Sequence, residues 1–359
     1  MGIVRTDERQ RMEIEEFRRM LLSCAGVHRR KEEDNNNMMK HVLTAVEEED
    51  DAPMKLVCVT SGVSFLGIAI VNQLLLRGYF VRVIVDNQED VEKVREIQMS
   101  GELRGNNNMV EAVMAKLSQV ESLLDAFDGC SGVFHTAAFV DPAGLSGYSK
   151  TMAQIEVKAT KNIVQACAST PSVRHCVLTS SLLACVWIDK TINNASLMID
   201  HKCWSDESVC INKKLWYALG KLRAEKAAWE LAKERGLKLA TICPGLITGP
   251  EFHHRNSTST IAYLKGAREM YRDGVLAIVD VNRLAKAHVF VYEEMKRNAT
   301  GRYICFDQKI ESQEEIDKLA RESGTEINIT RDVPVTCAIR FELSNLKLSM
   351  LMSKTSRCN

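Results

Sequence analysis

The sequence predicts an α/β fold, a Rossmann-type doubly wound parallel sheet with a smaller C-terminal substrate lobe. Three observations support this prediction. Short apolar runs alternate with helical stretches from Lys55 to about residue 250, a loop of glycines and serines separates the first run from the first helix, and the alternation becomes irregular beyond Pro250. Because apolar strands joined by helices are buried on both faces, this order is typical of a parallel sheet.

Six apolar runs of strand length are expected to form the sheet, at 55–60, 80–85, 109–114, 132–135, 173–179 and 237–243. Helical periodicity lies between them, most clearly at 68–77, 153–168 and 218–235. These limits give an NAD(P)-binding Rossmann domain at 54–250 and a mainly substrate-binding lobe at 251–359. Ligands of such folds bind at the carboxyl ends of the strands, so we expect the lobe to cover that edge.

Residues 1–53 differ in composition from the rest of the chain. A short amphipathic helix is expected at 13–24 (EIEEFRRMLLSC), and the charged stretches VHRRKEED and VEEEDDAP follow it. We expect a charged N-terminal extension that either keeps the chain in solution or docks onto a protein partner or the domain itself. The MGIVRT start also matches the pattern for N-myristoylation at Gly2, and chance matches to so short a pattern are common.

The composition argues against several classes of protein. The chain has 359 residues, 45% hydrophobic and 26% charged, and 47 basic residues balance 47 acidic ones. Zero net charge argues against a nucleic-acid partner, and no apolar run approaches the roughly 20 residues of an integral membrane span. The twelve cysteines lack the paired spacing of a metal site. We therefore expect no metal, and reduced thiols in a cytoplasmic protein.

Tyr217 and Lys221 lie four residues apart in KLWYALGK, at the start of the last predicted helix. Because positions i and i+4 share a helix face, the phenol and the ammonium are expected side by side. A neighbouring cation favours the phenolate, so Lys221 is expected to lower the pKa of Tyr217 from about 10 towards working pH. Ser180 and Ser181 follow the fifth strand in VLTSS, where a hydroxyl either holds a carbonyl oxygen or simply caps the strand end. Together these residues predict a carbonyl reductase or alcohol dehydrogenase.

TSGVSFLG, at 60–67, lies between the first strand and the first helix, which is the position of a dinucleotide-binding loop. In such a loop the backbone amides at a helix N-terminus meet the pyrophosphate. The residues expected to bind the cofactor here are Ser61, Gly62, Ser64, Phe65, Leu66 and Gly67.

From about residue 55 to residue 350 the sequence resembles the extended short-chain dehydrogenase/reductases of plants, in particular the cinnamoyl-CoA reductases and dihydroflavonol reductases. The resemblance rests on many segments in one order, VCVT, RGYFVRV, DGCSGVFHTAA, KNIVQAC, VLTSS, CWSD, KLWYALGKLRAEKAAWE, PGLITGP, IVDVNRLAKAHVFVYE, TGRYIC and LSNLKLS. It implies an NAD(P)H-dependent reductase of a phenylpropanoid-like carbonyl or acyl-CoA substrate.

The resemblance also implies roles for single residues. Ser181 matches the catalytic serine, Tyr217 the proton donor, and Lys221 the residue that tunes Tyr217 and hydrogen-bonds the nicotinamide ribose. Pro244 falls where the family loop packs beside the nicotinamide. The basic residues matched to binding of the CoA phosphates are Lys265 in IAYLK and Arg302 in TGRY, for which solvated surface charge is an equal alternative.

The cofactor loop departs from the family pattern TGxxGxxG, because Ser61 and Ser64 replace two of its glycines. A Cβ at the second position hinders the approach of pyrophosphate, unless the hydroxyl donates to phosphate instead. Asp86 follows the second strand where NADPH-dependent relatives have arginine, and a carboxylate favours NADH because it accepts hydrogen bonds from ribose hydroxyls and repels a 2′-phosphate. Family habit favours NADPH, and Arg82 and Lys93 are close enough in sequence to weaken the effect of Asp86.

Two further departures concern the adenine and the substrate. Lys116 replaces an aspartate that holds the adenine in relatives, and Ala262 replaces a histidine of the CoA-binding pattern. These changes support a second hypothesis, a catalytically weak cofactor-sensing or scaffold protein of the same fold. The intact set of Ser181, Tyr217 and Lys221 favours the enzyme.

Overall fold

The computed structural model describes residues 55–136, 148–189, 198–325, 327 and 340–355. The chain divides into two compact units, Met1–Met54 and Lys55–Asn359, and every described residue belongs to the second. The N-terminal extension, with its expected amphipathic helix and Gly2, lies outside the described residues.

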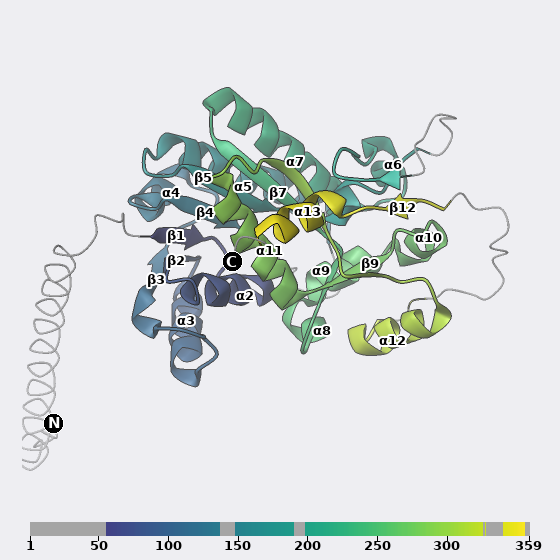
Figure 1. The fold of residues 1–359 in the computed structure, drawn as a ribbon, viewed down its shortest axis with the longest axis horizontal. Coiled ribbons are helices and arrows are strands. Elements are labelled where there is room, and N and C mark those ends of the chain that lie inside the picture. The colour runs from purple at the N-terminus through teal and green to yellow at the C-terminus, as the bar shows by residue number, and fades with distance from the viewer. Residues whose placement is uncertain (1–54, 137–147, 190–197, 326, 328–339, 356–359) are drawn as a thin grey trace, which may run out of the picture. The chain divides into compact units, whose positions relative to one another are not determined.

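A seven-stranded parallel sheet forms the centre of the second unit (Figure 1). Its strands lie in the spatial order β10 (Gly301–Cys305), β7 (Lys238–Pro244), β5 (His175–Thr179), β4 (Gly132–His135), β1 (Leu56–Val59), β2 (Phe80–Val85) and β3 (Val110–Met114). The chain runs from β1 outwards to β3 and then returns to β4 on the other side of β1. This reversal is the topological switch point at which doubly wound folds bind ligands, and it confirms the predicted fold class.

The seventh strand, β10, differs from the expectation of six. It pairs in parallel with β7, with Cys305 opposite Pro244. The sheet therefore includes chain from beyond residue 250, and the expected boundary there does not separate the sheet from the rest. The charged Arg302 in this short strand interrupts the apolar pattern by which the other strands were predicted.

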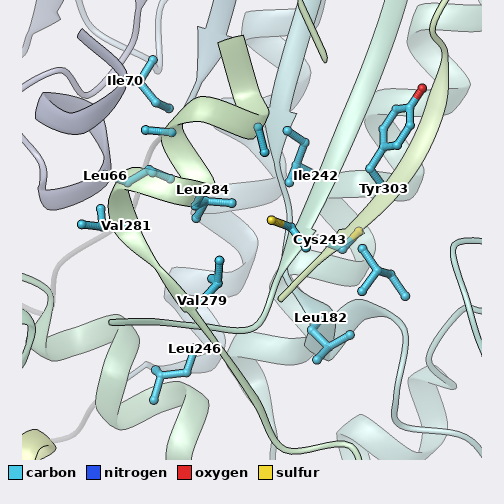
Figure 2. Close-up of a cluster of buried hydrophobic side chains, with 14 of the residues drawn as sticks. Leu66, Ile70, Leu182, Ile242, Cys243, Leu246, Val279, Val281, Leu284 and Tyr303 are labelled. Carbon is cyan, nitrogen blue, oxygen red and sulfur yellow. The ribbon is translucent and has the colours of Figure 1, made fainter. Parts of the chain in front are cut away.

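Alternate side chains of each strand pack on opposite faces of the sheet, as the period of two requires. Val57 and Val59 of β1 belong to one hydrophobic core, whereas Cys58 belongs to the other. The first core lies against α2 (Phe65–Leu75) and α11 (Val281–Met295). Figure 2 shows part of it, with side chains of α2, α11 and β7 around Leu66, Ile70, Leu284 and Ile242.

The second core lies beneath three helices, α4 (Val120–Phe127), α5 (Lys150–Ser169) and α7 (Trp216–Arg235). α7 starts two residues earlier than predicted, so Tyr217 lies in its first turn. The helix ends at Gly236, whose φ of 69° is the left-handed geometry that favours glycine after a helix.

The remaining elements are short. Two small sheets contain β8 (Leu246–Thr248), β9 (Ala277–Asp280) and β11 (Gln308–Lys309), and β6 (Met198–Ile199) with β12 (Glu342–Leu343). The other helices are α3 (Gln88–Ser100), η1 (Asn107–Met109), η2 (Leu182–Ala184), α6 (Glu207–Asn212), α8 (Phe252–Arg255), α9 (Ser257–Leu264), α10 (Ala267–Arg272), α12 (Gln313–Ser323) and α13 (Leu346–Thr355). Among the described helices, none combines the length and the apolar composition needed to cross a bilayer.

Candidate active site

A pocket at the carboxyl ends of β5 and β7 brings the predicted catalytic residues together. Ser181, Tyr217 and Lys221 line it, with Pro244 at the end of β7 and the first turn of α2. The space that remains between these side chains is about 50 Å³. Residues from four separate segments therefore converge where the fold places its ligands.

The two serines after β5 have different surroundings. The Ser180 hydroxyl donates to Glu225 Oε2 at 2.7 Å, so it faces the interior. Ser181 caps η2, and its hydroxyl oxygen accepts the amide hydrogen of Leu183 at 3.2 Å. Among the described residues no acceptor is found for the Ser181 hydroxyl hydrogen. Capping and a catalytic role are thus compatible, because that hydrogen can still be donated to a ligand.

Tyr217 and Lys221 share a face of α7, as their spacing predicts. Lys221 Nζ lies 5.6 Å from the centre of the Tyr217 ring. The ring of Tyr148 meets the Tyr217 ring edge to face with centroids 5.0 Å apart. The Tyr217 ring therefore has both an aromatic ring and a cation as neighbours.

Glu156 of α5 is a further residue of this site, which the sequence analysis missed. Its side chain is 4% exposed, and Oε1 lies 2.6 Å from Lys221 Nζ. The Tyr148 hydroxyl donates to the other carboxylate oxygen. The signal was present in the sequence, because Glu156 interrupts the apolar side of the predicted helix 153–168 between Ala153 and Ile163.

The expected direction of the pKa shift of Tyr217 was wrong, because its pKa is raised and not lowered. Burial raises the pKa of Tyr217, and although Lys221 lowers it, Glu156 raises it further, so that it lies above the ordinary value of 10. Burial lowers the pKa of Lys221, but Glu156 and Tyr217 outweigh burial and raise it overall. Lys221 thus remains a cation and Tyr217 remains a protonated phenol at neutral pH.

Two polar residues from the irregular C-terminal region also line the pocket, and no pattern in the sequence indicated either of them. Ser259 of α9 interacts with the Tyr217 hydroxyl and lowers the pKa of Tyr217. Asn256, between α8 and α9, lines this pocket as well as the larger cavity described below.

Arg302 is not placed to bind a substrate phosphate, which corrects its expected role. Its side chain is 7% exposed, and Nε lies 2.8 Å from Oε1 of Glu225 in the core. The guanidinium lies 3.5 Å from the centre of the Trp204 ring. Lys265, by contrast, is exposed at the end of α9, where Nζ donates to the Lys214 carbonyl at 2.9 Å. Neither residue lines the pocket of Tyr217.

The cofactor loop folds tightly onto the start of α2. A Cβ on Gly67 would lie 1.9 Å from the Ser61 carbonyl oxygen, so this position requires glycine. The Ser64 hydroxyl donates to that same carbonyl at 2.7 Å and accepts the Gly67 amide hydrogen at 3.1 Å. It is therefore already engaged, contrary to the expected alternative that it donates to phosphate. For the next two amides, Phe65 and Leu66, no acceptor is found in the described part of the chain.

A larger cavity of about 990 Å³ adjoins the pocket and shares Ser64, Asn256 and Ser259 with it. The cavity reaches Asp86 at the end of β2. Its charged lining consists of Asp86, Asp90, Lys93, Lys116, Lys158 and Arg255, and the imidazole of His254 also lines it. Lys93 pairs with Glu89 at 3.0 Å, whereas Arg82 does not line the cavity and pairs with Glu111 at 3.2 Å.

These features fit a dinucleotide. The cavity has the volume for such a ligand, its basic side chains suit phosphate groups, and two helix amides are available at the α2 N-terminus. In addition, the buried Thr136 hydroxyl in the pocket has no partner among the described residues, which a ligand oxygen would supply. The residues placed to hold the cofactor are Ser61, Ser64, Phe65, Leu66, Asp86, Thr136, Lys221 and Pro244.

Comparisons with known proteins identify the family of this chain. The model of the 3-beta hydroxysteroid dehydrogenase/isomerase family matches residues 58–313. Cinnamoyl-CoA reductase 1 of Petunia hybrida is 36% identical over 272 residues, which cover 74% of this chain and 77% of that protein. Tetraketide alpha-pyrone reductase 1 of Arabidopsis thaliana is 31% identical over 269 residues, which cover 74% and 80%.

Solved structures with the same fold include two reductases. Vestitone reductase from alfalfa (Medicago sativa) matches with a TM-score of 0.59 at 24% identity, covering 82% of this chain and 91% of its own. Yeast methylglyoxal/isovaleraldehyde reductase Gre2, complexed with NADPH, matches with a TM-score of 0.61 at 22% identity, covering 83% and 93%. At these identities the likeness shows the fold alone.

Proposed function

The chain belongs to the 3-beta hydroxysteroid dehydrogenase/isomerase family of extended short-chain dehydrogenase/reductases, and we propose that it is an NAD(P)H-dependent reductase of a phenylpropanoid-like carbonyl or acyl-CoA substrate. The observation that carries the proposal is the convergence of Ser181, Tyr217 and Lys221 in one pocket with the first turn of α2. A hydroxyl, a phenol and an ammonium at one point are the groups that carbonyl reduction requires.

Each residue has a separate part in the reaction. A reduced nicotinamide held in the cavity would supply the hydride for the carbonyl carbon. Ser181 donates its free hydroxyl hydrogen to the carbonyl oxygen and so holds it in place. Tyr217 transfers its phenolic proton to that oxygen, and the Lys221 ammonium stabilises the phenolate that remains.

The electrostatics of the pocket favour reduction over oxidation at neutral pH. Reduction needs the protonated phenol, whereas oxidation of an alcohol needs the phenolate as a base. Burial, with Glu156, raises the pKa of Tyr217 above its ordinary value despite Lys221. The form that donates a proton is therefore the abundant one.

We propose that NADH is the preferred cofactor, because Asp86 lies in the cavity at the end of β2. Two features oppose this preference: the lysines of the same cavity, and the habit of the plant relatives. Titration of the purified protein with NADH and with NADPH, followed by cofactor fluorescence, compares the two dissociation constants directly. Tighter binding of NADPH would overturn the preference for NADH and leave the reductase proposal in place.

Replacement of Tyr217 by phenylalanine tests the reductase function. Tyr217→Phe removes the transferred proton and should lower kcat about 10²–10⁴-fold with little change in cofactor affinity. The assay is cofactor oxidation with cinnamoyl-CoA and with cinnamaldehyde. Tyr271→Phe is the matched control, because the Tyr271 hydroxyl donates to the Glu311 carbonyl and the residue does not line the pocket. Equal turnover in Tyr217→Phe and the wild type would exclude the proposed proton transfer.

A second candidate is a cofactor-sensing or scaffold protein with weak catalysis. Two observations favour it: the Ser64 hydroxyl is engaged within the loop, and the ion pair with Glu156 occupies Lys221, which the family uses on the cofactor. Cofactor binding without oxidation by any aromatic aldehyde or thioester supports this candidate. Turnover that depends on Tyr217 excludes it.

We infer a cytoplasmic location from the cysteines. The nine described cysteines are free thiols, and eight of them are buried. Free thiols in this number are typical of a reducing compartment. Fractionation of cells that express the full chain tests the inference, and the same experiment with Gly2→Ala tests myristoylation.

A further inference from the structure

Glu156 is a buried acid for which the reaction described above has no use. It lies on α5 with its side chain turned to α7, and 4% of that side chain is exposed. Burial of an ionised carboxylate carries a large desolvation cost unless the charge is paired and hydrogen-bonded. Glu156 meets both conditions, since Lys221 pairs with one oxygen and Tyr148 donates to the other.

This arrangement connects Glu156 to the proton donor through Lys221. Lys221 Nζ is 2.6 Å from Glu156 Oε1 and 5.6 Å from the centre of the Tyr217 ring. The ammonium therefore contacts the carboxylate directly and acts on the phenol through its charge. Tyr148 completes the contact, because its hydroxyl reaches Glu156 while its ring packs edge to face on Tyr217.

The other titratable groups around this pair come from three elements. His135 at the end of β4 lines a small cavity together with Glu156, Lys221 and Glu225. Burial and Lys221 lower the pKa of His135 to about 3, so it is neutral. Glu225, one turn along α7 from Lys221, is itself paired with Arg302. Glu156 is thus the carboxylate in direct contact with Lys221.

We propose that Glu156 is a positioning residue of the reduction site, which holds the Lys221 ammonium on the α5 side and thereby keeps Tyr217 in its protonated, proton-donating form. The inference rests on the proposed reductase function. Glu156 does not touch the substrate; it acts through Lys221. Glu156 favours the reduction step, because its negative charge partly offsets the effect of the Lys221 charge on the Tyr217 phenol and so disfavours the phenolate.

The direct test measures the ionisation of Tyr217 in the full-length protein without any turnover. Protein labelled with [13Cζ]tyrosine gives signals from seven tyrosines, and the one absent from Tyr217→Phe belongs to Tyr217. Glu156→Gln keeps the shape of the side chain and removes its charge. The Tyr217 titration midpoint should then fall by about one pH unit. A midpoint that stays in place or rises overturns the proposal.

Two further variants serve as a control and as a replacement for Glu156→Gln. Gln154→Ala, at an exposed position of the same helix, should leave the midpoint at its wild-type value. If circular dichroism shows that Glu156→Gln does not fold, Glu156→Asp replaces it. The shorter acid keeps its charge but withdraws from Lys221, so the midpoint should fall by a smaller amount. No fall in Glu156→Asp then overturns the proposal.

The kinetic test uses the pH dependence of kcat for carbonyl reduction. Activity is lost at alkaline pH as Tyr217 ionises, and Glu156→Gln should move this limb to lower pH by the same interval. A purely structural glutamate would lower stability without moving the limb, and that result overturns the proposal. If the wild type reduces no carbonyl substrate, the proposed function fails, whereas the Tyr217 titration still decides the role of Glu156.

Discussion

The helix α7 contributes one partner to each of three ion pairs of nearly equal length, Lys221–Glu156 at 2.6 Å, Glu225–Arg302 at 2.8 Å and Arg223–Glu207 at 2.9 Å. Their exposure is very different. The first two pairs are at most 7% exposed, whereas the side chains of the third are 44% and 35% exposed. Burial, and not length, therefore decides how much solvation each pair has lost and what its removal changes.

The two buried pairs differ in the number of their other partners. Glu225 also accepts hydrogen bonds from Ser180 and Thr241, and Arg302 donates to the His201 carbonyl while its guanidinium stacks on a tryptophan ring. Lys221 has one carboxylate partner among the described residues and faces the pocket. The Glu225 pair thus belongs to the scaffold behind the site, and the Lys221 pair can respond to a ligand.

The largest effect should follow from breaking the scaffold pair. Arg302→Met leaves the Glu225 carboxylate buried without a counter-charge, which should lower the free energy of unfolding by about 3–5 kcal/mol. Urea denaturation followed by circular dichroism measures the loss. The same measurement also reports how much the ion pair stabilises the β10 strand, because Arg302 is the charged residue of that strand.

A double variant isolates the cause. Glu225→Gln combined with Arg302→Met removes the unpaired charge. The amide oxygen can accept from one of the two hydroxyls of Ser180 and Thr241, and the amide NH2 can donate to the other. The double variant should be more stable than Arg302→Met alone, since a buried neutral amide costs less than a buried unpaired carboxylate. A loss below about 1 kcal/mol in the single variant would contradict the contrast between the buried pairs and the exposed one.

The next effect concerns His135, beside the Lys221 pair. Burial and Lys221 lower the pKa of His135 to about 3, whereas the unfolded chain has the ordinary value of 6.5. Below pH 6.5 the unfolded state therefore binds more protons, and stability is lost as the pH falls from 6.5 towards 3. Between pH 6 and pH 5, His135→Gln should reduce the slope of stability against pH by about 1 kcal/mol per pH unit.

A matched variant separates titration from packing. His135 Nδ1 lies 2.9 Å from the Thr60 hydroxyl and Nε2 lies 3.3 Å from that of Thr160. Thr160→Val removes one of these partners but keeps the imidazole. It should lower stability at every pH and leave the slope as in the wild type. An unchanged slope in His135→Gln would mean that His135 does not contribute to the acid sensitivity.

The features that the sequence predicted are those that depend on local patterns. The six apolar strands are present within two residues at each end, because apolar runs between helices leave a clear signal. The spacing of Tyr217 and Lys221 correctly placed them on one helix face. The position of a strand, and the shared face of residues i and i+4 in a helix, follow from backbone periodicity that a short stretch of sequence determines.

The features that were missed depend on interactions between residues that are far apart in the sequence, some of which have opposing effects. Arg302 was expected either to bind the CoA phosphates or to be a solvated surface cation, since arginines are mostly exposed, and only the fold brings Glu225 to it. The sign of the Tyr217 pKa shift depends on whether burial or Lys221 has the larger effect, and this balance includes a carboxylate on α5. A glutamate on an apolar helix face was the available signal for Glu156.

The smallest effect is expected for the exposed pair of α7. Arg223→Gln removes the 2.9 Å contact with Glu207, yet stability should change by no more than about 0.5 kcal/mol, because water solvates both groups. Glu207 also keeps two favourable interactions, since Lys226 lies 3.5 Å away and Glu207 occupies the first turn of α6, where the helix dipole favours an acid. The measurement is the urea midpoint at low salt and at 1 M salt. A loss comparable to that of Arg302→Met would show that contact length, and not burial, sets the energy of the three pairs.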